Sequence, residues 1–217
     1  MAIITNHMKV MNSALGKIGG GAIMAEDEDT ELAAQVVPTY YSRLKSLLGM
    51  CEWSFAGRTY KLDAIAKVAE NDYDTASMIF NNGWRQAFSL PGTRIGLPRK
   101  VLTDPRRPND PLREYLIEGG VLYADREQVW ATVTVMPDPT VWDPQFNLAA
   151  EAIVAADLCV PVTHDANLAK DLRQVAEGSA QENGRGGLVG RAITSEAIKA
   201  RTAAPLWRDP LTDARLR

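Results

Sequence analysis

The chain has 217 residues, with 46% hydrophobic residues, 24% charged residues and a formal net charge of −3 at pH 7. These values are typical of an ordinary globular protein whose core is large enough to fold without disulfide or metal staples. The acidic balance argues against a general nucleic-acid-binding protein, which would carry a basic surplus. It remains compatible with DNA that slides past the protein without tight phosphate contacts.

Cysteine usage and the N-terminal residues favour synthesis in a reducing cytoplasm. Cys51 and Cys159 lie in apolar settings without a further Cys or His at ligand spacing, so we interpret both as buried thiols. Residues 1–10 contain no apolar core of signal-peptide length. No apolar run approaches the ~18 residues that a membrane span needs, so we expect no membrane partner.

Two helices are predicted in the first 56 residues. Apolar residues at helical spacing predict one over residues 8–18 and another over 30–48, with a kink at Pro38. An acidic stretch precedes the second helix and suits the positive end of its dipole. The same stretch is our candidate for a contact between subunits and comprises Glu26, Asp27, Glu28 and Asp29.

The middle of the chain changes to a period of two, which predicts a small antiparallel sheet. Gly119 and Gly120 separate two apolar runs as a hairpin turn does, and residues 129–135 alternate apolar with polar. We expect a long loop over residues 91–111, a length that usually indicates function. Its candidate contacts with the tail or with a neighbouring subunit are Arg94, Arg99, Arg106 and Arg107.

Helical periodicity returns at Asp143-Pro144, a cap followed by proline at the first helical position, and Pro161 should end this helix. Thr163 or Asp165 should cap a further helix. From residue 183 the chain is rich in glycine and carries seven basic against three acidic residues, with a short helix over 195–201. We interpret it as a flexible extension that folds on a partner, with docking candidates Arg185, Arg191, Arg201, Trp207 and Arg208.

These patterns predict an α+β fold in which a helical bundle core carries an inserted small antiparallel sheet and a flexible C-terminal tail. The helical core comprises residues 1–56 and 141–182, the β-rich insertion 57–140 and the C-terminal extension 183–217.

No residue pattern in the chain is specific for catalysis or for a cofactor. His7 and His164 lie apart from any nucleophile motif, and no glycine-rich phosphate loop or metal-ligand spacing is present, so we expect neither an enzyme nor a cofactor. Paired carboxylates are harder to exclude, because glycoside hydrolysis needs only two of them. A peptidoglycan hydrolase with candidates among residues 26–31, Asp138 and Asp143 is therefore the alternative.

Several landmarks in order resemble the phage tail tubular protein A family of head-to-tail adaptors. The resemblance covers roughly residues 8–177, and its glycine-rich ending differs from the family's. Its landmarks are Asn12-Ser13-Ala14-Leu15-Gly16, Trp53-Ser54-Phe55-Ala56, Tyr60-Lys61-Leu62, Phe88-Ser89-Leu90-Pro91, Trp142-Asp143-Pro144-Gln145-Phe146 and Cys159-Val160-Pro161-Val162-Thr163.

The resemblance implies a structural protein of the virion neck, between capsid and tail. Such proteins form a dodecameric ring below the portal protein, bind a tail or nozzle protein on the far side, and surround the double-stranded DNA without binding it tightly. They use no cofactor or catalytic residue. A tail terminator or neck protein of another tail type is the nearest structural alternative.

Overall fold

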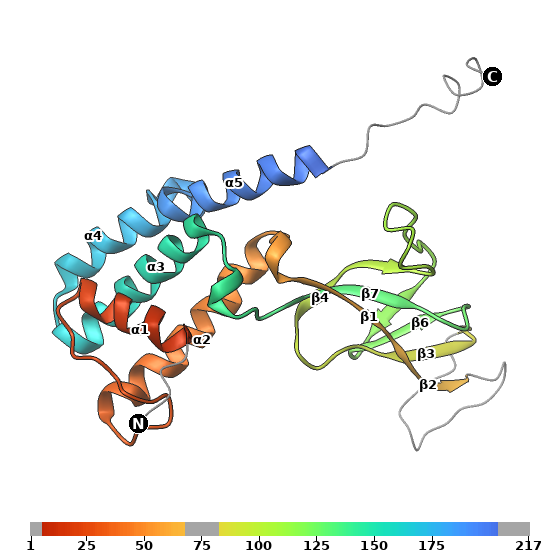
Figure 1. Ribbon diagram of the computed structural model, residues 1–217, viewed down its shortest axis with the longest axis horizontal. Coiled ribbons are helices and arrows are strands. Elements are labelled where there is room, and N and C mark those ends of the chain that lie inside the picture. The colour runs from red at the N-terminus through yellow and green to blue at the C-terminus, as the bar shows by residue number, and fades with distance from the viewer. Residues whose placement is uncertain (1–5, 68–82, 204–217) are drawn as a thin grey trace, which may run out of the picture.

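The computed structural model of the chain describes residues 6–67 and 83–203 (Figure 1). Within these residues the chain forms five α-helices and two small antiparallel sheets. In Figure 1 the helices gather at one end and the sheets at the other. The predicted α+β class, with a helical core and an inserted antiparallel sheet, is confirmed.

The helices come from both parts of the chain that flank the sheets. In chain order they are α1 Asn6–Lys17, α2 Glu31–Met50, α3 Pro144–Thr163, α4 Ala166–Glu177 and α5 Gly187–Ala203. The strands are β1 Gly57–Lys61, β2 Asp63–Lys67, β3 Gln86–Ser89, β4 Arg94–Leu102, β5 Leu116–Glu118, β6 Val121–Ala124 and β7 Trp130–Val135. Short 3-10 turns lie at η1 Ser54–Ala56, η2 Pro139–Val141 and η3 Ala180–Glu182.

α3 is the central helix, and the four other described helices contact it. It begins as predicted, with the Asp143 carboxylate accepting a hydrogen bond from the Gln145 N–H and with Pro144 at the first position. Pro161 does not end the helix, contrary to expectation. The helix continues to Thr163, and His164 closes it in the left-handed conformation at a φ of 57°.

By length and composition alone, α3 is the one helix among residues 6–67 and 83–203 that could cross a membrane. Within the bundle, 56% of its most apolar window is buried. A helix that is apolar all round is expected where neighbouring helices cover every side. Packing in the bundle core therefore accounts for this composition.

α2 begins close to the predicted residue, because the Thr30 side chain accepts a hydrogen bond from the Ala33 N–H. Its predicted apolar stripe is buried, and the helix continues through Pro38. Of the acidic residues, only Glu31 lies in the first turn. The others form a separate loop ahead of the helix.

The two sheets have strand orders β1-β7-β4 and β2-β3-β6-β5, and side chains from both share one apolar cluster that includes Phe88, Leu122 and Val133. The predicted hairpin is present: Gly119 and Gly120 join β5 to β6 at φ values of 56° and 85°. Positive φ at both central residues suits the tight turn of a two-residue hairpin.

The predicted loop over residues 91–111 is wrong in its first half. Residues 94–102 form β4, which pairs with β7 through an irregular register between Ile95 and Lys100. Gly96 lies in this irregular part with a φ of 74°. Glycine and proline are rare inside regular strands, but this irregular stretch accommodates Gly96 and Pro98.

The predicted flexible extension from residue 183 is wrong for residues 187–203, which form α5. Val189 and Ala192 of α5 are buried in the bundle core. Gly187 has a φ of 54°, and a Cβ added there would lie 2.4 Å from the Val175 carbonyl oxygen. The glycines that suggested a loose chain therefore permit close packing of α5 on the end of α4. Trp207 and Arg208 lie outside the described residues.

Candidate partner-binding surfaces

The exposed side of α5 forms an open groove of about 600 Å³, with Arg185 and Arg191 among its lining residues. Both side chains are exposed, and neither guanidinium forms an ion pair with another described residue. Ile198, 60% exposed, lines the same groove. We call these three residues with Gln145 and Glu182 the α5 groove. It brings together two predicted docking residues and combines positive charge with apolar surface, as protein interfaces do.

The opposite side of α5 is anchored by buried charge. Glu196 is 5% exposed, and its Oε1 accepts a hydrogen bond of 2.7 Å from the Ser54 N–H. Lys199 pairs with Asp143 at the start of α3 and lies 3.9 Å from the Glu196 carboxylate. The hydrogen bond from Lys199 is the main reason why the pKa of Asp143 is lowered. These contacts fix α5 to the bundle, so its exposed groove has a defined orientation.

Arg99 lies in β4 and not in the predicted loop, and its side chain is bound within the fold. Its Nε donates to Thr134 Oγ1 at 2.8 Å and its Nη1 donates to the Trp53 carbonyl oxygen at 2.9 Å. Burial is the largest influence on its pKa and lowers it. Arg94 likewise lies in β4 and donates to the Pro91 carbonyl oxygen at 3.2 Å. Arg99 therefore joins the sheet to the segment that follows α2.

Arg106 and Arg107 remain candidates for an external contact. Both are exposed in the turn between β4 and β5, and neither side chain has a hydrogen bond or ion pair with a described residue. The turn is shaped by Asp104, whose side chain accepts from the Arg106 N–H at 2.9 Å. In Figure 1 this turn projects from the sheet end of the molecule.

In the acidic stretch, Glu26 and Glu28 accept hydrogen bonds from neighbouring groups, whereas Asp27 and Asp29 are exposed. Glu26 accepts a hydrogen bond of 2.7 Å from the Tyr41 hydroxyl. Glu28 accepts from the Met24 and Ala25 N–H groups, and the first of these bonds is the main cause of its lowered pKa. Asp27 and Asp29 are exposed and make no ion pair with the described part of the chain.

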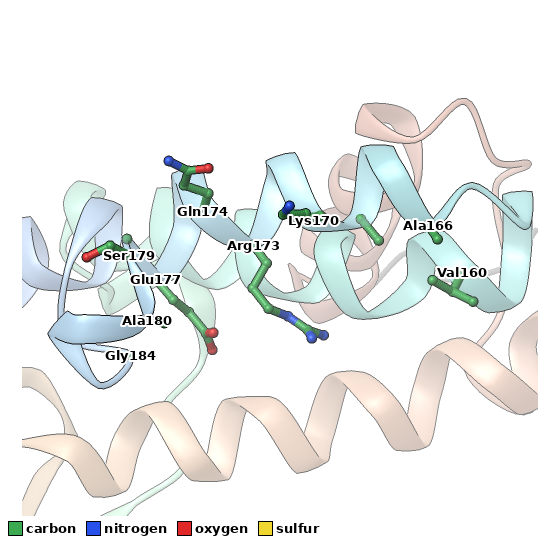
Figure 2. A pocket seen from close by; sticks show the side chains of 11 residues that line it. Val160, Ala166, Lys170, Arg173, Gln174, Glu177, Ser179, Ala180 and Gly184 are labelled. Atoms are coloured by element: carbon green, nitrogen blue, oxygen red, sulfur yellow. The ribbon is translucent and has the colours of Figure 1, made fainter.

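A larger hollow of about 700 Å³ lies along α4, and Figure 2 shows how its lining residues are arranged. Val160 at the end of α3 and Ala166 at the start of α4 lie at one end, with Ser179 and Gly184 at the other. Lys170 projects from the α4 segment between these ends. We call this hollow the α4 groove. No sequence pattern indicated this groove, because the apolar spacing of α4 alone is that of an ordinary amphipathic helix.

The side chains that the sequence suggested for catalysis are buried or hold structural positions in the fold. His7 Nδ1 lies 2.8 Å from the Tyr40 hydroxyl, and burial lowers its pKa. Asp138 caps η2 and Asp143 caps α3. Burial raises the pKa of the Cys51 thiol to about 11, which disfavours the reactive thiolate. In residues 6–67 and 83–203, no group of three or more metal-binding side chains is found.

No protein-family model matches the sequence, and no curated protein matches it significantly.

Proposed function

We propose that this chain is a phage head-to-tail adaptor, a structural protein that forms a ring between the portal protein and the tail and surrounds the DNA path. The order of sequence landmarks that resembles the tail tubular protein A family supports the proposal. The ring would sit in the virion neck and need no cofactor. The DNA would pass through it without tight binding, consistent with the net acidic charge.

The observation that carries the proposal is that α5 is firmly anchored to the bundle and borders an exposed groove whose two arginines form no ion pair with described residues. Lys199 and Glu196 hold one side of the helix on the bundle, while Arg185 and Arg191 remain available on the other. A partner surface rich in carboxylates would complement this charge and guide association. We assign this groove to the portal protein, and the turn containing Arg106 and Arg107 to the tail side or to a neighbouring subunit.

Mass measurement by light scattering tests the proposal, using the protein alone and mixed with the portal protein from the same virus genome. We expect a ring, or a complex with one chain per portal subunit. Arg185→Glu with Arg191→Glu should weaken the complex at least about tenfold, because reversed charges repel a complementary partner. Arg126→Glu is the matched control, since Arg126 is exposed in the turn between β6 and β7.

The outcomes separate the assignment of the groove from the function. A portal complex that both the double variant and the control form equally well would exclude the α5 groove as the docking surface. A chain that neither forms rings nor binds the portal protein would overturn the adaptor function itself. Removing residues from 183 onward is not a useful test, because α5 contributes Val189 and Ala192 to the core. Removing residues 204–217 is the appropriate truncation for Trp207 and Arg208.

A further inference from the structure

The α4 groove has an apolar floor that the described part of the chain leaves uncovered. Val160 is 47% exposed at one end of the groove, and Ala166 is exposed beside it. Arg173 is already paired with Asp157 at 2.7 Å, and Glu177 lies 3.8 Å from Arg43. Lys170 forms no ion pair with any described residue. The groove therefore offers a hydrophobic surface with one uncompensated positive charge.

The loop between α1 and α2 has the complementary character. Met24 is 66% exposed at its tip, and exposed Asp27 and Asp29 follow it closely. In Figure 1 the loop leaves α1 beside the turn between α3 and α4 and then runs to the beginning of α2. It thus presents an apolar side chain flanked by uncompensated negative charge.

Hydrogen bonds hold this loop in one shape. Buried Ile23 is fixed at both backbone groups: its N–H donates to Asn12 Oδ1 at 2.9 Å, and its carbonyl accepts from Asn12 Nδ2 at 3.0 Å. Glu28 accepts from the Met24 N–H at 2.7 Å. A preformed projection loses little conformational entropy on binding, and methionine adapts its shape to an apolar hollow.

We propose that residues 22–29 of one subunit dock in the α4 groove of the next subunit. Met24 covers the apolar floor near Val160 and Ala166, and Asp27 and Asp29 face Lys170. The two surfaces are formed by different residues, so the contact is heterologous, and repetition of it about an axis gives a ring when the rotation closes. This inference rests on the proposed function, since it names the contact that builds the adaptor ring.

Cysteine cross-linking tests the contact directly. The Met24→Cys/Ala166→Cys chain, in which Cys51 and Cys159 are replaced by alanine so that no other thiol is present, is oxidised under mild conditions, alone and mixed with the portal protein from the same virus genome. We expect a ladder of disulfide-linked multimers on non-reducing gels. Each single variant gives at most dimers, because one engineered thiol per subunit can join only two chains. Mixing the two single variants, with different tags, should give a dimer that contains one of each.

A charge-reversal series provides the second arm. Asp27→Lys with Asp29→Lys should raise the concentration needed for assembly at least about tenfold, as should Lys170→Glu. Combining both aspartate reversals, Asp27→Lys and Asp29→Lys, with Lys170→Glu should restore assembly to within about threefold of the unaltered chain. Glu127→Lys, an exposed charge reversal between β6 and β7, should have no effect.

The possible negative results distinguish failure of the docking contact from failure of the adaptor function. A ring seen by light scattering without the cross-linked ladder, or without charge rescue, overturns this docking contact and leaves the adaptor function standing. A faster-migrating cross-linked monomer places the loop and the groove together within one chain and also overturns it. If no multimer forms with or without the portal protein, the docking contact and the adaptor function fail together.

Discussion

Replacing Arg99 with alanine should destabilise the fold, although the sequence suggested an external contact. The change removes two hydrogen bonds from a charged donor, one to Thr134 Oγ1 and one to the Trp53 carbonyl oxygen. Each such bond contributes about 1.5–3 kcal/mol to stability. The change also removes Nη2 of Arg99, which is buried without a hydrogen-bond partner among the described residues. Its desolvation costs about 1–3 kcal/mol, and relief of this cost offsets part of the loss. We therefore expect a net loss of about 2–3 kcal/mol.

Thermal unfolding followed by circular dichroism measures this loss. For a chain of this size, 1 kcal/mol shifts Tm by about 2–4 °C, so Arg99→Ala should lower Tm by roughly 4–12 °C. Arg99→Lys should recover only part of it, because an ammonium group cannot reproduce the guanidinium fork. Arg106→Ala, on the exposed turn, should stay within about 0.5 kcal/mol of the unaltered chain. If Arg99→Ala and Arg106→Ala behave alike, Arg99 does not join the sheet to the segment after α2.

Two further predictions concern α5 and its anchor. Gly187→Ala should destabilise the fold by about 2 kcal/mol or more, measured by urea unfolding, because the φ of Gly187 is positive and the Val175 carbonyl leaves no room for a Cβ. Gly16→Ala is the control and should be neutral or slightly stabilising, because nothing lies within 4 Å of a Cβ added there. Lys199 lowers the pKa of Asp143 in the folded chain, so this pair stabilises the fold above the unfolded pKa of about 3.9 and stops doing so as the pH falls through the folded pKa. Asp143→Asn, which keeps a capping oxygen, should therefore lower Tm at pH 6, and the difference should shrink as the pH falls through the folded pKa of Asp143. A difference that does not change as the pH is lowered would contradict the ion-pair account.

The elements that the sequence predicted well are those whose signals are local. The Asp143-Pro144 start depends on a side chain and a ring one residue apart, and the Gly119-Gly120 hairpin depends on positive φ at two adjacent residues. The glycines at residues 184–190 were misinterpreted, because glycine occurs both in flexible segments and where two backbone segments pack closely. Only the tertiary position of the Val175 carbonyl distinguishes the two at Gly187.

The candidate surfaces were predictable only in part, for a similar reason. Exposed charge such as that of Arg185 and Arg191 follows from composition, and the structure brings both to one groove. The role of Arg99 depends on acceptors that lie 35 and 46 residues away in the sequence. The α4 groove needs the end of α3 and the turn after α4 together, so no single segment encodes it.

The segment between α2 and β1 is held from two directions, and this arrangement makes a final prediction. The Ser54 N–H donates to Glu196 of α5, while the adjacent Trp53 carbonyl accepts from Arg99 of β4. The two side chains also attract each other electrostatically, because Glu196 raises the pKa of Arg99 against the larger effect of burial. Once either contact is lost, the segment is freer and the other contact orders it less effectively.

A double-mutant cycle measures this coupling. The losses in unfolding free energy for Arg99→Ala and Glu196→Ala should not add, and the double variant should lose less than their sum by at least about 0.5 kcal/mol. Arg99→Ala combined with Asp138→Ala, which removes a cap on η2, is the control and should be additive within about 0.5 kcal/mol. Additivity in both pairs would show that α5 and the sheet are independent. Coupling in the first pair alone means that α5 and the sheet stabilise the segment between α2 and β1 together.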